Sequence, residues 1–221
     1  MQGVFEASST LVRPILGVKG WKTIAFSREK MFSSTPVVLT TITSANTPRQ
    51  YVASRVQSVT TSSFQIALEN MHDLTGHEPE VVDWLAFSTG DGKIGGKQLF
   101  EARLMGSVNQ KQLTQNFAYS FSAAPAFFAA PQSYKQAAPV MLKLAARTTK
   151  AAAVLHLCGL LCDANQASCG NHHAENTGYL AIQGQGIMKF YSQAVCDDKY
   201  KNGDEEGVDC GGSCKKCVKG W

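Results

Sequence analysis

The side chains best suited to metal or thiol chemistry are gathered in one short stretch of the chain. Eighteen consecutive positions hold His156, Cys158, Cys162, Cys169, His172 and His173. Zn²⁺ prefers thiolate and imidazole ligands, so a structural zinc site is one interpretation. The spacing Cys-x3-Cys-x6-Cys-x2-His-His, however, matches no zinc motif that we can justify. Cys162 and Cys169 flank a turn-like hexapeptide, so we expect a disulfide that closes this hairpin and leaves Cys158 buried or available for an interchain bond.

The other cysteines are close to the C-terminus. Four of them lie in the final 26 residues, at Cys196, Cys210, Cys214 and Cys217. This segment has almost no large apolar side chains and cannot form a core unaided, so covalent or metal staples are needed to order it. Two disulfides of open connectivity are expected, which favours an oxidising compartment. A zinc ion bound by four thiolates is the intracellular alternative.

Oxygen-bearing side chains are interspersed among the tail cysteines. They are Asp197, Asp198, Asn202, Asp204, Glu205 and Asp209. Hard cations such as Ca²⁺ prefer oxygen ligands, but the spacing departs from the twelve-residue EF-hand loop. A calcium site is therefore a hypothesis beside that of a solvated acidic loop. The string Asn-Gly-Asp-Glu-x-Gly-x-Asp-Cys-Gly-Gly-x-Cys-x-x-Cys also resembles a short Cys-rich extracellular module of large secreted and surface proteins.

The sequence gives little support to catalysis or to nucleic-acid binding. It contains no Gly-x-Ser-x-Gly elbow, no phosphate-binding Gly-Lys-Ser/Thr loop and no His-Glu-x-x-His helix, so we expect no enzymatic activity. Charged residues make up 17% of the chain and the net charge is only +4. No basic run is interleaved with aromatic residues, as a nucleic-acid surface would require. No apolar stretch approaches the roughly 20 residues that span a bilayer.

The elements that must position these side chains belong to an internal repeat. Phe100-Glu101-Ala102 follows Phe5-Glu6-Ala7 by 95 positions (100 − 5), and other matches keep that offset. They pair Phe26-Ser27 with Phe121-Ser122, Pro36 with Pro131, Glu80 with Glu175, and Trp84-Leu85-Ala86 with Tyr179-Leu180-Ala181. We infer two copies joined by a glycine-rich linker between residues 88 and 97.

Within each copy the hydrophobic pattern has a period of two. Short β-branched or aromatic runs such as 37–43, 64–68 and 81–87 are bounded by turn-forming residues, and Phe64, Ile66 and Leu68 share one face. The Ala-rich stretch 145–153 is assigned to strand rather than helix because of its register with the first copy. We therefore predict an all-β chain with two tandem antiparallel β-sandwich domains, 1–95 and 96–192, and a Cys-rich module, 193–221.

The first copy resembles the H-type lectins, a family of small sandwich agglutinins. The residues that carry the resemblance are Ile24-Ala25-Phe26, Met31-Phe32, Pro36 to Leu39, Ile42-Thr43, Val52 to Thr60, Ser63-Phe64, Met71 to Thr75 and Val82 to Ala86. The resemblance implies a six-stranded sandwich that assembles as trimers or their multiples. It also implies galactose- or N-acetylgalactosamine-type sugars bound in shallow clefts between subunits.

The family's sugar-binding residues are only partly present. Met71-His72 stands where binding members carry Trp-His, Tyr51 replaces their arginine with Arg49 and Arg55 nearby, and no acidic residue occurs in 16–23. The second copy has Gln166 and Ala167 at the hairpin positions and is expected to be scaffold. The candidate carbohydrate-binding residues of the first copy are Tyr51, Arg55, Met71, His72 and Asp73.

Two functions follow as expectations. The first is a non-enzymatic extracellular structural or adhesive protein, one segment of a cell-surface or filament assembly, with itself or other extracellular proteins as partners. The alternative is a carbohydrate-binding lectin that uses the His72 hairpin. Residues 1–6 lack the features of a signal peptide, so we expect the chain to be a segment of a longer secreted protein.

Overall fold

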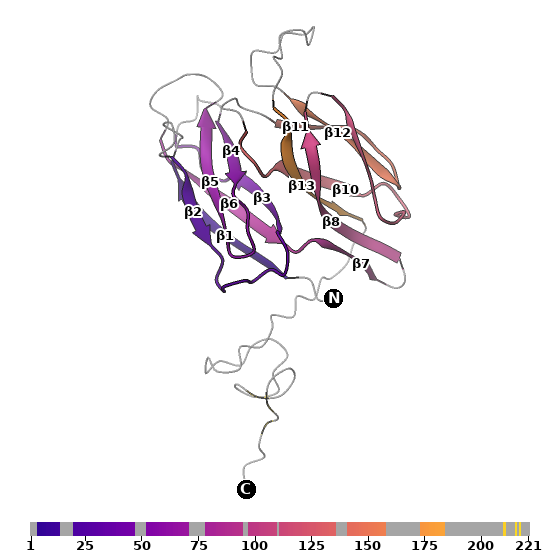
Figure 1. Cartoon of the computed structure of the whole chain (residues 1–221), viewed down its shortest axis with the longest axis horizontal. Coiled ribbons are helices and arrows are strands. Elements are labelled where there is room, and N and C mark those ends of the chain that lie inside the picture. Colours follow the sequence, from indigo (N-terminus) through magenta and orange to yellow (C-terminus); the bar gives the residue numbers. More distant parts are fainter. Residues whose placement is uncertain are drawn as a thin grey trace. The chain divides into compact units, whose positions relative to one another are not determined.

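The computed structural model shows a chain of antiparallel strands (Figure 1). The chain divides into two units, Met1–Gly184 and Gln185–Trp221. The structure describes residues 4–13, 20–46, 52–70, 78–94, 97–109, 111–135, 141–157 and 173–183, together with Cys210, Lys215 and Cys217. The described part contains strands and turns but no helix, and so no helix that is long and apolar enough to cross a membrane. The predicted all-β class is confirmed.

Six strands form the first strand set, drawn from indigo to magenta in Figure 1. They are β1 (Phe5–Val12), β2 (Lys22–Ala25), β3 (Val37–Ile42), β4 (Val52–Gln57), β5 (Ser63–Asn70) and β6 (Glu80–Phe87). They make two three-stranded sheets, in the orders β1-β6-β3 and β2-β5-β4. Because β1 and β3 both pair with β6, the strands that begin and end this segment lie side by side.

The second strand set repeats this order and adds one strand. Its members are β7 (Gly90–Ile94), β8 (Lys97–Val108), β9 (Leu113–Asn116), β10 (Ala126–Pro131), β11 (Met141–Arg147), β12 (Ala151–Leu157) and β13 (Glu175–Ile182). The sheets have the orders β10-β13-β8-β7 and β11-β12-β9. Strands β8 to β13 therefore take the places of β1 to β6, and β7 is an addition at one edge.

Alternating apolar residues build a core between the two sheets of each set. Phe64, Ile66 and Leu68 are fully buried on β5, as their shared face predicts. They pack with Trp84 of β6, whose ring meets that of Phe64 edge-on at 5.2 Å between centroids. In the second set the corresponding cluster forms around Tyr179. The result is a β-sandwich-like packing in each set.

The Ala-rich stretch 145–153 is not helical, as its register predicts. It consists of the end of β11, a turn and the start of β12. The hydroxyl of Thr148 accepts hydrogen bonds from the N–H groups of Lys150 and Ala151, and Thr60 does the same for Ser62 and Ser63 in the first set. The two turns are 88 positions apart. Side-chain capping of this turn type thus outweighs the helix propensity of alanine.

The predicted glycine-rich linker is wrong, because residues 90–94 form β7 and pair with β8. Gly92 is opposite Phe100, and a Cβ atom on Gly92 would lie 2.1 Å from the Phe100 ring. The missing side chain therefore lets this ring lie on the strand. Gly90 has φ +153°, which also favours glycine. Gly90 and Gly92 are therefore required by the packing and backbone of β7. Gly95 and Gly96 lie outside the described residues.

The repeat keeps its 95-position offset only in part of each set. Phe5 pairs with Phe87 as Phe100 pairs with Ile182, so β1 and β6 match β8 and β13 at that offset. In contrast, Val37 pairs with Phe87 and Ala126 with Ile182, so β3 and β10 are 89 positions apart. Pro36 therefore corresponds to Pro125, and its predicted match with Pro131 is wrong.

The predicted match of Phe26 with Phe121 is also wrong. Two aromatic residues of each set donate their backbone N–H groups to adjacent carbonyls of the Thr-capped turn. The bonds are Phe26 to Ser62 and Phe32 to Thr61 in the first set, and Phe117 to Lys150 and Phe121 to Thr149 in the second. Phe26 thus corresponds to Phe117, and Phe32 to Phe121. Shorter early connections and a longer one between β12 and β13 explain why the offset drifts and then returns.

An apolar cluster joins the two strand sets. Val37, Leu39 and Phe87 of the first set pack with Leu180 and Ala102 of the second. All five side chains lie on the faces of their sheets that point away from the sandwich cores, since their strand neighbours Val38, Ala86 and Ala181 belong to those cores. We call this contact the junction. It makes the two sets parts of one unit.

The Gln132 side chain adds polar contacts to the junction. Its amide nitrogen donates to Pro36 O at 3.0 Å, and its amide oxygen accepts from Val38 N at 3.2 Å. Both backbone groups belong to the edge of β3 that faces away from β6. Gly178 lies beneath this amide, since a Cβ atom there would be 1.6 Å from Gln132 Oε1.

We expect Gly178→Ala to destabilise the protein by about 2 kcal/mol, because Gln132 must swing away and lose two hydrogen bonds of about 1 kcal/mol each. The measurement is chemical denaturation of the full chain. Gly106→Ala on β8 is the matched control, because nothing lies within 4 Å of a Cβ atom at Gly106. Equal stability of the two variants would show that the amide contact contributes little.

Candidate functional site at the junction

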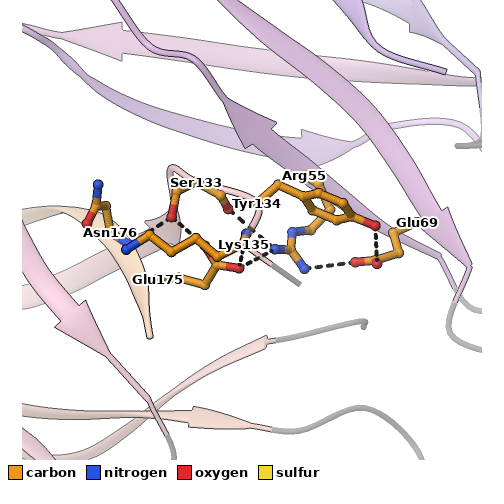
Figure 2. A network of polar contacts seen from close by, with 7 residues as sticks. All are labelled: Arg55, Glu69, Ser133, Tyr134, Lys135, Glu175 and Asn176. Atoms are coloured by element: carbon orange, nitrogen blue, oxygen red, sulfur yellow. Dashed lines mark hydrogen bonds and ion pairs between the residues drawn. The ribbon is translucent and has the colours of Figure 1, made fainter. Parts of the chain in front are cut away.

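A buried arginine is the centre of the polar part of the junction (Figure 2). Arg55 lies on β4 and its side chain is 1% exposed. One terminal nitrogen, Nη1, is 2.8 Å from Glu69 Oε2 on the paired strand β5. The other, Nη2, is 3.3 Å from Glu175 Oε1 at the start of β13 and 3.4 Å from the carbonyl oxygen of Ser133. One side chain of the first set therefore binds two groups of the second.

Glu175 is held by a loop of its own strand set. Its Oε1 accepts the N–H of Lys135 at 3.0 Å, and its Oε2 accepts the hydroxyl hydrogen bond of Ser133. Ser133 Oγ in turn accepts the N–H of Asn176 at 2.9 Å. The carboxylate is fully buried, and these donors compensate for the loss of water. The arrangement fixes the loop after β10 against the start of β13.

The first set contains the same arrangement around Glu80. The Glu80 carboxylate accepts from the Ser44 hydroxyl and from the N–H of Asn46 at 3.0 Å. Ser44 Oγ accepts the N–H of Val81 at 2.7 Å, as Ser133 does for Asn176. A buried glutamate that pins the loop after the third strand is thus a repeated feature. The ion pair with Arg55 is added to it in the second set.

Tyr134 covers the arginine from the second set. Its hydroxyl donates to Glu69 Oε1 at 3.0 Å, and its ring lies 4.9 Å from the Arg55 guanidinium carbon. The Trp21 ring meets the Tyr134 ring edge-on at 5.2 Å. Glu69 therefore binds both Arg55 and Tyr134, and the cation is placed against an aromatic face.

These groups are arranged so that they bind one another. An arginine stays protonated in proteins, so it can neither donate nor accept a catalytic proton. One cation and two carboxylates are buried together, and each makes hydrogen bonds with its neighbours, which buried ion pairs require. Such a network specifies which surfaces meet, because a shifted contact would leave buried charges unpaired.

The Tyr134 hydroxyl is expected to resist ionisation. Burial, together with the neighbouring Glu69 carboxylate, raises the pKa of Tyr134 to about 12. Because this pKa is raised above its unfolded value near 10, the stabilisation is complete below pH 10 and is lost as the pH rises toward 12. The tyrosinate absorbance of the native protein should therefore include a late-titrating component.

That component should disappear in Tyr134→Phe, which is measured by ultraviolet absorbance against pH. Tyr119 is about half exposed and serves as the control position. Tyr119→Phe should leave the late component in place. An unchanged late component in Tyr134→Phe would assign it to another residue, of which Tyr179 is the candidate because burial and Glu101 raise its pKa as well.

The structure describes one of the five predicted sugar-binding residues. Tyr51, Met71, His72 and Asp73 lie outside the described residues. Arg55 is described, and the structure places it in the junction with its two terminal nitrogens bound to Glu69 and Glu175. A sugar cannot reach this guanidinium while the junction is closed.

The predicted thiol and metal sites are described at two positions. Cys210 and Cys217 form a disulfide. A zinc ion bound by all four tail thiolates is therefore not formed in this structure. Cys158, Cys162, Cys169, His172, Cys196, Cys214 and the six proposed calcium ligands lie outside the described residues, and nothing is described of the His156 side chain. The described residues contain no group of three or more metal-ligating side chains.

Sequence reasoning missed Glu69, Tyr134 and Ser133 as members of the site. One signal was present, because the repeat matches Glu80 with Glu175 and a glutamate at a strand start is unusual within an apolar pattern.

Comparison of the chain with protein-family models, with curated proteins and with solved structures finds no match.

Proposed function

We propose that the chain is a non-enzymatic extracellular building block, in which two tandem β-sandwich domains and a Cys-rich module form one segment of a surface or filament assembly. The observation that carries the proposal is the junction. Its apolar cluster, the Gln132 amide and the Arg55 network together hold the two strand sets in a defined arrangement. A defined arrangement of repeated domains is what a load-bearing or assembling segment needs.

The disulfide supports an extracellular location for this function. Disulfides persist mainly in oxidising compartments, and Cys210 and Cys217 are joined in the second unit. The described polar network supports the non-enzymatic part of the proposal, because its groups bind one another and present no nucleophile paired with a base.

The proposal is tested by the self-association of the full oxidised chain. We expect concentration-dependent, ordered assembly in sedimentation velocity and electron microscopy. Galactose and N-acetylgalactosamine should leave this assembly unchanged. A chain that stays monomeric at all concentrations contradicts the proposal.

The lectin alternative is tested separately by glycan-array binding with competition by free sugar. The variant is His72→Ala, and His77→Ala is its matched control, since both imidazoles belong to the same connection between β5 and β6. Hapten-competed binding that is lost only in His72→Ala would replace the building-block proposal with the lectin.

A further inference from the structure

The junction joins two different surfaces of the repeated fold. The first set contributes mainly Val37 and Leu39 of the edge strand β3, together with Phe87 of β6 and Phe5 of β1. The second set contributes Leu180 of β13, the central strand, and Ala102 of the neighbouring β8. By the register of the repeat, β13 corresponds to β6 and not to β3. The contact is therefore heterologous, meaning that the two partners use non-equivalent patches.

A heterologous contact leaves one patch unused on each partner. The counterpart of Leu39 in the second set is Phe128 on β10, 89 positions later. We name the surface around Phe128 the donor patch. Leu39 packs in the junction, whereas Phe128 is 53% exposed and is among the most exposed of the large apolar side chains described.

On the first set, the part of the opposite patch beyond Phe5 and Phe87 is not covered by the junction. The counterparts of Leu180 and Ala102 are Leu85 on β6 and Ala7 on β1, both at an offset of 95. We name the surface around them the acceptor patch. Leu180 and Ala102 are buried in the junction, but Leu85 is only half-buried and Ala7 is exposed. Leu11, which lies on the same face of β1 as Ala7, is 52% exposed.

The polar part of the junction also has counterparts. Val56 pairs with Ile66 as Leu144 pairs with Val154, so Arg55 corresponds to Lys143 on β11. Lys143 is exposed. Glu175 corresponds to Glu80, which lies in the same kind of serine-pinned loop. An exposed basic side chain thus occupies the position of Arg55, and a buried carboxylate held by Ser44 and Asn46 occupies the position of Glu175.

We infer that the donor patch of one chain binds the acceptor patch of a second copy of the same chain, and so repeats the junction between molecules. This inference rests on the proposed function and names the partner and the surfaces of the assembly. Such a contact would continue one that the protein already makes, since the counterparts of these residues pack together within the chain. A heterologous contact repeated from chain to chain produces a ring if it closes and a filament if it does not.

The first test is sedimentation velocity of the full oxidised chain and two variants. Phe128→Ser removes the apolar centre of the donor patch, and Lys143→Glu reverses its charge. Each should weaken the self-association constant at least tenfold without changing the thermal unfolding midpoint, because both side chains are exposed. Tyr119→Ser is the matched control, since Tyr119 is a 48% exposed aromatic residue in the loop between β9 and β10. It should associate as the parent does.

The second test locates the contact. A photoreactive phenylalanine analogue is placed at position 128, and the protein is mixed with isotopically labelled chain before illumination. We expect cross-links from the unlabelled chain to labelled peptides that contain β1 or β6. Cross-links confined to residues 185–221 of the same chain would overturn the inference, because they would show that the tail covers Phe128.

The two proposals fail in different ways. A parent chain that never associates removes the building-block function and this inference with it. A parent chain that associates while Phe128→Ser and Lys143→Glu associate equally well overturns this inference alone, since the assembly then uses other surfaces.

Discussion

Arg55→Met should lower the free energy of unfolding by about 3–5 kcal/mol, because it leaves the buried carboxylates of Glu69 and Glu175 without their shared cation. Methionine keeps much of the side-chain volume, so the loss reports on charge rather than on a cavity. Guanidinium chloride denaturation of the full chain measures the change. We further expect the single transition to broaden or split, since the network joins the two strand sets.

The control for this prediction is Lys143→Met. Lys143 occupies the position of Arg55 in the second set but is exposed, so its replacement should change stability by no more than about 0.5 kcal/mol. A second comparison is the triple variant Arg55→Met, Glu69→Gln, Glu175→Gln. It should recover part of the loss, because no buried charge then remains unpaired. Arg55→Met as stable as the parent would show that water or another cation satisfies the carboxylates.

Phe64→Ala should be comparably damaging, with a loss of about 3–5 kcal/mol typical of a buried phenylalanine. Phe64 is fully buried in the core of the first set, where its ring contacts those of Trp84 and Phe26 at centroid distances of 5.2 and 5.7 Å. Chemical denaturation measures the loss.

A compensating substitution follows from the repeat. The second set has Ala152 in place of Phe64, and it has Phe127 on β10 in place of Val38 on β3. Phe127 stacks on Tyr179 at 5.2 Å and belongs to the same sheet as Tyr179, whereas Phe64 contacts Trp84 from the other sheet of its set. Val38→Phe in the Phe64→Ala background should therefore restore part of the lost stability, since the core volume is approximately conserved.

Val38→Phe alone is the control for this pair, and it should destabilise because the first core is already filled. A double variant less stable than Phe64→Ala would show that the two cores are not interchangeable in this way. Such an outcome would place the difference in the backbone rather than in the side-chain volumes.

Local patterns predicted many of the strands, although not β7. The alternation of Phe64, Ile66 and Leu68 assigned β5 to the core, and the repeat correctly assigned the Ala-rich stretch to strand. The repeat was also correct where β1 and β6 match β8 and β13, as for Phe5 and Phe100. It failed at Phe26 and Pro36, because loop lengths differ between the copies and no constant offset can follow them.

The junction could not be predicted from such patterns. Arg55 and Glu175 are 120 positions apart, and nothing in the period of either strand shows that they meet. The sequence predicts a sugar ligand at Arg55, because a single arginine beside a hairpin has no local sign of its partner. The glycines of β7 were misread for a related reason, since Gly92 accommodates Phe100, a long-range requirement within a sequence that resembles a linker.

The strand β7 and the Gln132 amide both affect whether a strand of another chain can add to these sheets. An unpaired sheet edge is a template on which another chain can add a strand, and proteins protect such edges to avoid amyloid-like aggregation. β7 covers the edge of β8, and Gln132 occupies backbone groups on the edge of β3. Strand addition is therefore obstructed at β8 and at β3, which favours packed faces over added strands as the contact in a polymer of this chain.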